Sequence, residues 1–189
     1  MNPPELNTPR LVLRLPTAED VPEVVRFYDE NREHLAPWWP RRSADFFLPA
    51  AHAGRVLQAL SDFERGSAVR LLVFDRSSPG GVIGLVNFND IIRGAAQFAS
   101  VGYALDGRAQ GQGLMTEALQ PAIAYMFESH NLHRITANYI PHNVRSGAVL
   151  RRLGFVVEGY ARDYLLIDGK WRDHILTGLV NPNWELPNG

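Results

Sequence analysis

A short loop with two closely spaced glycines, Arg108–Thr116, is the feature of this sequence that most constrains its fold. It reads Arg-Ala-Gln-Gly-Gln-Gly-Leu-Met-Thr, follows a strand-like run at Val101–Leu105 and leads directly into a helix-like segment. Backbone N–H groups at such a turn bind anions, and glycine lets a phosphate approach them closely. The sequence therefore predicts either a phosphate-binding loop or a plain tight turn here.

Two better-known glycine motifs are excluded by individual residues. A dinucleotide-binding fingerprint needs a third glycine where Thr116 stands, and a nucleoside-triphosphate loop needs Gly-Lys-Ser or Gly-Lys-Thr, which the segment lacks. A phosphate held at this loop therefore belongs to another class of ligand.

Composition favours one globular, cytoplasmic domain over residues 1–189, since 46% of the residues are hydrophobic and 21% are charged. No apolar run is long enough for a membrane span, and Met1–Glu5 lacks the character of a signal peptide, so no membrane association is expected. The net charge of −1 does not favour a general nucleic-acid binder. The chain has no cysteine, and His130 and His133 lack a nearby carboxylate cluster, so no metal site is expected.

Hydrophobic periodicity predicts the secondary structure. Thr17 is the predicted cap of the first helix, with Asp20 three residues later. The helix after the glycine loop is amphipathic, although Pro121 should bend or loosen its first turns. The predicted strands are 11–15, 69–75, 82–89, 97–105, 134–140 and 155–158, and the other helices are 17–31, 50–65 and 143–153.

Two turn signals complete this outline. Ser77–Gly81 predicts a turn between two strands, and Asp168–Gly169 predicts a tight hairpin between 164–167 and 171–176. The order β-α-α-β-β-β-α-β-α-β-β is that of a mixed αβ sandwich, in which the strand ending at Leu105 delivers the chain to the glycine loop.

A second constellation follows at Asn143–Gly159, where Asn-x-x-Ser precedes Gly-Phe-x-x-Glu-Gly. Asn143 is a candidate helix cap, and Gly154 a candidate end of the same helix. On these residues alone, Asn143 and Ser146 are either a cap with a surface serine or part of a ligand site.

The glycine loop resembles the pyrophosphate-binding loop of the GCN5-related N-acetyltransferases (GNAT), which hold acetyl-CoA, and the Asn143–Gly159 pattern is similar to the second half of their donor site. Longer segments resemble the RimJ/RimL-type ribosomal-protein-alanine N-acetyltransferases, most closely the RimJ branch, over nearly the whole chain. These segments are Trp38–Pro40, Gly84–Phe88, Ile91–Gly94, Asn138–Asn143 and Glu158–His174.

The resemblance implies an α+β GNAT fold, a mixed and mostly antiparallel central sheet with helices on both faces, and acetyl-CoA as cosubstrate without a metal. It also implies a set of donor-binding residues, with the strand before the loop supplying oxyanion donors and pairing with pantetheine where the strands diverge. That set is Tyr103, Ala104, Leu105, Arg108, Gln110, Gly111, Gln112, Gly113, Leu114, Met115, Thr116, Asn143 and Ser146.

The implied reaction transfers acetyl to the α-amine of a protein N-terminus, with the alanine terminus of a ribosomal protein as the implied partner. An α-amine titrates near 8, so roughly a tenth is already neutral at pH 7, and only a modest base is needed. Ser146 matches the acid proposed for the RimL relatives; a serine hydroxyl is a poor acid, so we expect it to donate a hydrogen bond or relay a proton.

The base is not identified by the sequence. The RimL-type glutamate aligns with Leu165, and Ser100 stands where many relatives have glutamate. Four residues remain as candidates, each with a structural alternative. Asp163 could be a turn residue or an arginine partner, and Tyr164 a core ring. His142 could be a polar residue of a loop, and Glu128 part of a solvated helix face.

The acceptor pocket is expected to be formed by aromatic and amide side chains, of which the two tryptophans could equally be core residues under a loop. These are Trp38, Trp39, Asn87, Phe88 and Tyr164. Two alternatives to protein N-terminal acetylation stay open. The acceptor could be a small amine, an antibiotic or a lysine, or the chain could bind acetyl-CoA without catalysis as a ribosome-assembly factor.

Overall fold

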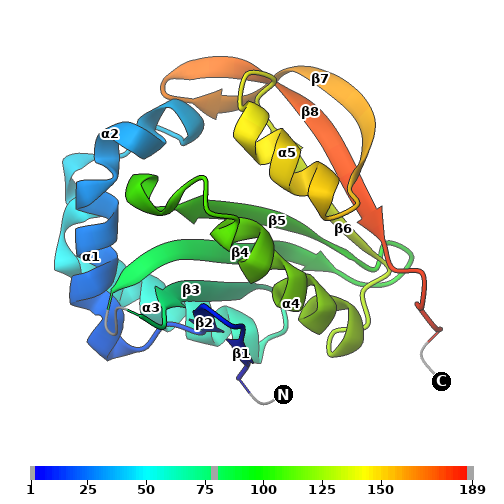
Figure 1. The fold of residues 1–189 in the computed structure, drawn as a ribbon, viewed down its shortest axis with the longest axis horizontal. Coiled ribbons are helices and arrows are strands. Elements are labelled where there is room, and N and C mark those ends of the chain that lie inside the picture. Colours follow the sequence, from blue (N-terminus) through cyan, green and yellow to red (C-terminus); the bar gives the residue numbers. More distant parts are fainter. Residues whose placement is uncertain (1–2, 78–80, 187–189) are drawn as a thin grey trace.

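The computed structural model describes residues 3–77 and 81–186 and forms an α+β sandwich around a single twisted sheet (Figure 1). The sheet has eight strands in the order β1-β2-β3-β4-β5-β6-β8-β7. Every neighbouring pair is antiparallel except β5 and β6, which are parallel. The strands are β1 (Glu5–Asn7), β2 (Leu11–Arg14), β3 (Val69–Asp75), β4 (Val82–Ile92), β5 (Phe98–Leu105), β6 (Arg134–Tyr139), β7 (Val156–Ile167) and β8 (Lys170–Val180).

Helices cover both faces of the sheet, with α1 and α3 on one side and α4 and α5 on the other (Figure 1). Short 3-10 turns lie at Ala18–Asp20, Ala36–Trp38, Ala44–Phe47 and Gly107–Ala109. The α-helices are α1 (Val21–Glu30), α2 (Arg32–Leu35), α3 (Pro49–Glu64), α4 (Leu114–Glu128) and α5 (Val144–Arg152).

Most of the predicted elements are confirmed, and the local signals have the expected cause. Thr17 and Asp20 form a reciprocal capping box at the start of the first helical segment. Asp168 and Gly169 have φ angles of 46° and 74°, as a primed two-residue hairpin turn requires. The turn predicted at 77–81 lies partly outside the described residues.

Three differences from the sequence prediction are tertiary in origin. Strand β1 is too short to show a period, and it exists because it pairs with β2. Strand β4 continues to Ile92 through a bulge in which Asp90 has a φ of 53°. Strand β7 is one bulged strand rather than two separate ones, because β8 pairs along its whole length.

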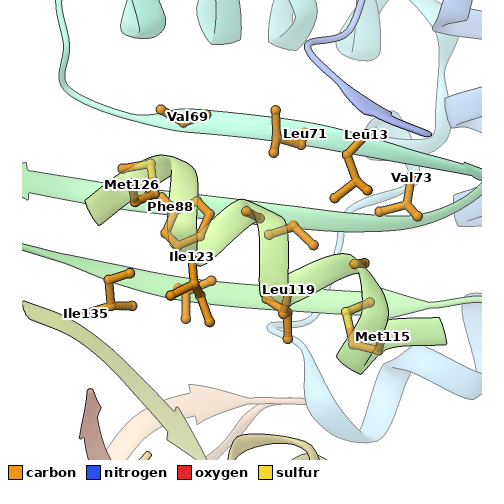
Figure 2. Close-up of a cluster of buried hydrophobic side chains, with 14 of the residues drawn as sticks. Leu13, Val69, Leu71, Val73, Phe88, Met115, Leu119, Ile123, Met126 and Ile135 are labelled. Carbon is orange, nitrogen blue, oxygen red and sulfur yellow. The ribbon is translucent and has the colours of Figure 1, made fainter. Parts of the chain in front are cut away.

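The core is divided by the sheet into two layers. Alternate residues of β3 show this plainly, since Leu71 and Val73 face α4 while Leu72 and Phe74 face α1. Figure 2 shows the larger layer, with Met115, Leu119, Ile123 and Met126 of α4 seated on the strands.

Helix α4 runs without interruption through Pro121, contrary to the loosening expected there. Proline removes one backbone donor, but the neighbouring Ala118, Leu119 and Ala122 are completely buried against the sheet. Packing of this face therefore holds the helix together across the missing hydrogen bond.

His130, directly after α4, is a buried polar group that constrains the dependence of stability on pH. Its ring lies 5.3 Å from that of Tyr125, and within the described part of the chain neither ring nitrogen has a hydrogen-bond partner. Burial, with a smaller contribution from the charge of Arg93, lowers the pKa of His130 from 6.5 to about 4. The folded state therefore favours the neutral ring.

This shift predicts a loss of stability in mild acid. Because the pKa of His130 is lower in the folded state, its contribution is complete above pH 6.5 and is lost as the pH falls toward about 4. We expect the free energy of unfolding to fall by about 3 kcal/mol across this window, since each pKa unit corresponds to about 1.4 kcal/mol. Urea titrations should show that His130→Leu removes this part of the pH dependence and that His133→Asn keeps it. An unchanged slope in His130→Leu would contradict the assignment.

Candidate active site

The glycine loop adopts the conformation that its sequence predicts. Gly111 and Gly113 both have a φ of 77°, in the left-handed region that favours glycine, and Gly113 caps α4. No acceptor among the described residues is hydrogen-bonded to the N–H groups of Gly113, Leu114 or Met115. Three free donors at the positive end of a helix are suited to a phosphate.

The loop is held in place by Asp106, which is 6% exposed and directly precedes it. Its carboxylate accepts hydrogen bonds from the backbone and side chain of Arg108 and, at 3.1 Å, from the amide of Asn31. The side-chain oxygen of Asn31 also accepts a hydrogen bond from the Gly107 N–H at 2.9 Å. The Arg108 guanidinium holds the pKa of Asp106 well below its usual range, so this carboxylate is ionised.

Arg108, one of the expected donor-binding residues, helps to position the loop. Its guanidinium is engaged by Asp106 and Glu30, and its own N–H donates to Asp106. The backbone N–H of Arg108 is therefore not available to a phosphate, and a contact of its exposed side chain with the donor stays a prediction.

Arg10, in the connection between β1 and β2, contacts the glycine loop, and no sequence pattern indicated this. Its guanidinium donates to the Gln112 carbonyl at 3.1 Å and pairs with Glu117 in the first turn of α4. Glu117 also accepts from the Thr8 hydroxyl at 2.6 Å, which ties the β1–β2 connection to the loop. The sequence shows an acidic residue, Glu117, in the first turn of the helix, which favours a helix start. It does not show the partners of Glu117, because they lie over a hundred positions away.

The parallel strands β5 and β6 pair over three residues only and then diverge. The last pair is Ser100 with Thr136, and the rest of β5 has no β6 partner. The expected divergence before the glycine loop is therefore present, and it exposes the β6-facing edge of Val101–Leu105 beside α5. Ala104 and Leu105 are buried in the two core layers, so only their backbone can contact a ligand.

The opening between the unpaired part of β5 and the start of α5 is called the gap below. The hydroxyl of Tyr103 reaches across it and lies 2.8 Å from the Oγ atom of Ser146 on α5. Burial raises the pKa of Tyr103 to about 12, so its hydroxyl stays protonated and can donate to Ser146. The structure thus pairs the predicted acid with a hydroxyl on the opposite strand.

Asn143 caps α5, since its side-chain oxygen accepts from the Ser146 N–H at 3.1 Å. The capping interpretation of the sequence is therefore confirmed, and the Asn143 amide group remains available for a ligand. At Gly147 an added Cβ would lie 2.8 Å from the Tyr139 ring, so glycine allows α5 to pack closely on β6.

Gln110 and Trp38 link the two sides of the gap. The Gln110 amide lies 2.9 Å from the His34 ring of α2 and accepts from Arg145 of α5. The Trp38 ring lies 5.3 Å from that of His142, just before α5. The loop, α2 and the start of α5 therefore converge above the divergence.

The predicted bases are placed differently from one another. His142 adjoins Asn143 at the gap, and the Tyr164 hydroxyl lies 3.4 Å from the Asn138 amide on β6. Asp163 sits in the bulge of the edge strand β7, where its N–H donates to Asp173. Glu128 ends α4, at the opposite end from the glycine loop, so the helix itself separates it from the gap.

The expected acceptor residues are separated by the pleat of β4. Asn87 pairs with Gly102 and points to the face opposite α4, where Asn138 and Tyr164 also lie. Phe88 is completely buried beneath α4, so its side chain is a core residue rather than the expected acceptor contact (Figure 2). Leu114 and Met115 are likewise core side chains, whereas Thr116 is only half-buried.

No group of three or more His, Asp or Glu side chains among the described residues is arranged to hold a metal ion. None of the helices in the same residues is both long and apolar enough to cross a membrane.

A strand that diverges from a parallel neighbour beside an anion-binding helix terminus defines an acyl-CoA-type transferase site, and the chain belongs to the acetyltransferase (GNAT) family, whose domain model matches residues 10–156. The predicted GNAT fold is confirmed. The chain is 45% identical over 179 residues to "[Ribosomal protein uS5]-alanine N-acetyltransferase" of Escherichia coli, covering 95% of this chain and 92% of the relative.

Solved structures agree with this placement. The ribosomal-protein-S5-alanine acetyltransferase of Vibrio fischeri superimposes with a TM-score of 0.93 at 39% identity, over 97% of this chain and 100% of that one. RimJ of Mycobacterium smegmatis, in complex with CoA-disulfide, superimposes with a TM-score of 0.86 at 28% identity, over 98% and 89%.

Proposed function

We propose that this chain transfers acetyl from acetyl-CoA to the α-amine of a protein N-terminus, and that its natural acceptor is the N-terminal alanine of a ribosomal protein. The observation that carries the proposal is the free edge of β5 running into a glycine loop with free N–H groups. The 45% identity to a uS5-alanine N-acetyltransferase, over nearly the full length of both chains, supports this acceptor.

The donor fits the residues present. The N–H groups of Gly113, Leu114 and Met115 would hold the pyrophosphate, and the nearby Arg10 adds positive charge. The β6-facing edge of β5 would hydrogen-bond the pantetheine arm as a strand would, with the Asn143 amide on the opposite side of the gap. Near Tyr103 the same edge would stabilise the oxyanion that forms during transfer.

In the transfer step, the acceptor nitrogen attacks the acetyl carbonyl carbon, and the bond from that carbon to sulfur breaks. The departing thiolate receives a hydrogen bond or proton from Ser146, whose hydroxyl is in turn supported by Tyr103. The amine proton leaves through His142, directly or through water, because this is the predicted base that lies beside Ser146 in sequence and at the gap in space. The acceptor enters over Trp38, Asn87 and Tyr164.

The decisive experiment measures release of the CoA thiol with short peptides. We expect release with peptides that begin with a free alanine, and none when the same peptide carries a blocked N-terminus. Equal reaction of blocked and free peptides would overturn the assignment to α-amines. Tight acetyl-CoA binding without any thiol release would show a binding protein rather than an enzyme.

The loop is tested by Gly113→Ala. Alanine is strained at a φ of 77°, and its Cβ would stand on the face that the phosphates approach, 3.9 Å from Arg10. We expect KM for acetyl-CoA to rise about tenfold, with a smaller change in kcat. The matched control is Gly54→Ala in α3, where no atom lies within 4 Å of the added Cβ and the KM should not move. Equal KM values for the two variants would contradict the phosphate role.

The hydroxyl pair is tested by Ser146→Ala and Tyr103→Phe. If Tyr103 acts through Ser146, the first change should lower kcat about a hundredfold and the second about tenfold, with little change in KM for acetyl-CoA. The double variant should then be no slower than Ser146→Ala, because the two residues form one unit. Additive losses in the double variant would show that Tyr103 acts independently.

A further inference from the structure

A cavity of about 200 Å³ lies on the acceptor side, between α1, α2 and the tip of the β7–β8 hairpin. The proposed transfer does not use it. In Figure 1 the hairpin tip curls over toward α2, and the Asp168 N–H donates to the Trp39 carbonyl at 2.9 Å, which closes one end of the cavity. Asp168 and Trp39 both line it.

The floor of the cavity is aromatic and tightly packed. Tyr28 lies 5.3 Å from Trp39 and 4.9 Å from Phe46, and the buried His52 ring stacks on Tyr28. Burial, followed by the charge of Arg55, lowers the pKa of His52, so this floor is uncharged at neutral pH. Such a surface takes the apolar part of a side chain.

Two arginines stack on the Phe46 ring of this floor and have no carboxylate partner among the described residues. The Arg42 and Arg55 guanidinium groups lie 4.6 Å and 4.1 Å from the centre of the Phe46 ring, on which both are stacked. In the described chain neither has a carboxylate within 4.0 Å, whereas Arg41 has Asp168 at 3.7 Å and Arg32 has Asp29 at 2.8 Å. Burial and the charge of Arg55 both lower the pKa of Arg42, so a bound anion would relieve an unfavourable arrangement.

The cavity adjoins the site of transfer through two successive tryptophans. Trp38 contacts His142 at the gap, while Trp39 lines the cavity. A peptide whose terminal amine lies at the gap would therefore extend past Trp38 and Trp39 toward Arg42, and each extended residue spans about 3.5 Å.

We propose that this cavity selects the acceptor by binding an acidic side chain in the segment that follows the N-terminal residue. The proposal rests on the function proposed above. A protein carboxylate is favoured over the phosphates of a nucleic acid for two reasons. The enclosed volume suits one or two side chains, and the net charge of −1 gives the chain no extended positive field for a polyanion.

The test is a scan of peptides that begin with free alanine and carry one glutamate at successive later positions, each paired with its glutamine counterpart. At low salt, one glutamate position should raise kcat/KM about tenfold over glutamine. Arg42→Gln should abolish this preference while the glutamine peptides react as before, and Arg42→Lys should retain part of it. The matched control is Arg151→Gln, an exposed arginine on α5, which should keep the full preference.

Three results would overturn the inference. They are equal kcat/KM for glutamate and glutamine peptides in the wild-type protein, an unchanged preference in a folded Arg42→Gln, and displacement of the acidic peptide by a tighter-binding RNA oligonucleotide. Folding of each variant is checked by its thermal transition. Failure of the proposed function differs from all of these, because then no free-amine peptide would be acetylated. Peptide binding, followed by tryptophan fluorescence, would still test the cavity.

Discussion

The short parallel pairing of β5 with β6 is the constraint on which the rest of the structure depends. Parallel neighbours need a crossover connection, which here is α4, so the chain that leaves β5 at Leu105 passes through the glycine loop into the helix N-terminus at Leu114. Because the pairing stops at Ser100 and Thr136, the same strand also keeps a free edge. One topological requirement thus places an anion site and a set of backbone donors side by side.

Polar contacts around the gap keep the glycine loop and the free edge of β5 in position. Asp106 and Asn31 fix the loop from below, and Arg10 and Glu117 fix it from the first turn of α4. These buried or half-buried pairs keep the donors of the loop free by satisfying the neighbouring groups themselves. The sheet then separates two tasks: Tyr103 and Ser146 lie on the face of α4 and α5, while Asn87 and Tyr164 lie on the face of α1.

Prediction from sequence succeeded where the cause is local. The capping box at Thr17, the hairpin at Asp168 and the two glycines of the loop each depend on the conformational preferences of a few neighbouring residues. It failed where distant segments decide. Asn87 and Phe88 were both expected at the acceptor pocket, but the pleat turns these neighbours to opposite faces. Nor did a local pattern indicate that the Arg108 guanidinium pairs with Asp106 and Glu30.

By itself, the sequence determined the order of the elements, the glycine loop and the family resemblance, because backbone conformation and hydrophobic period are properties of short segments. Only the tertiary structure decided which side chains meet. It brought Tyr103 to Ser146, left Asp163 in the bulge of an edge strand, and set Arg42 over an aromatic cavity beside Trp39. These contacts join residues tens of positions apart, and their partners are chosen by strand register and helix packing, which no local pattern records.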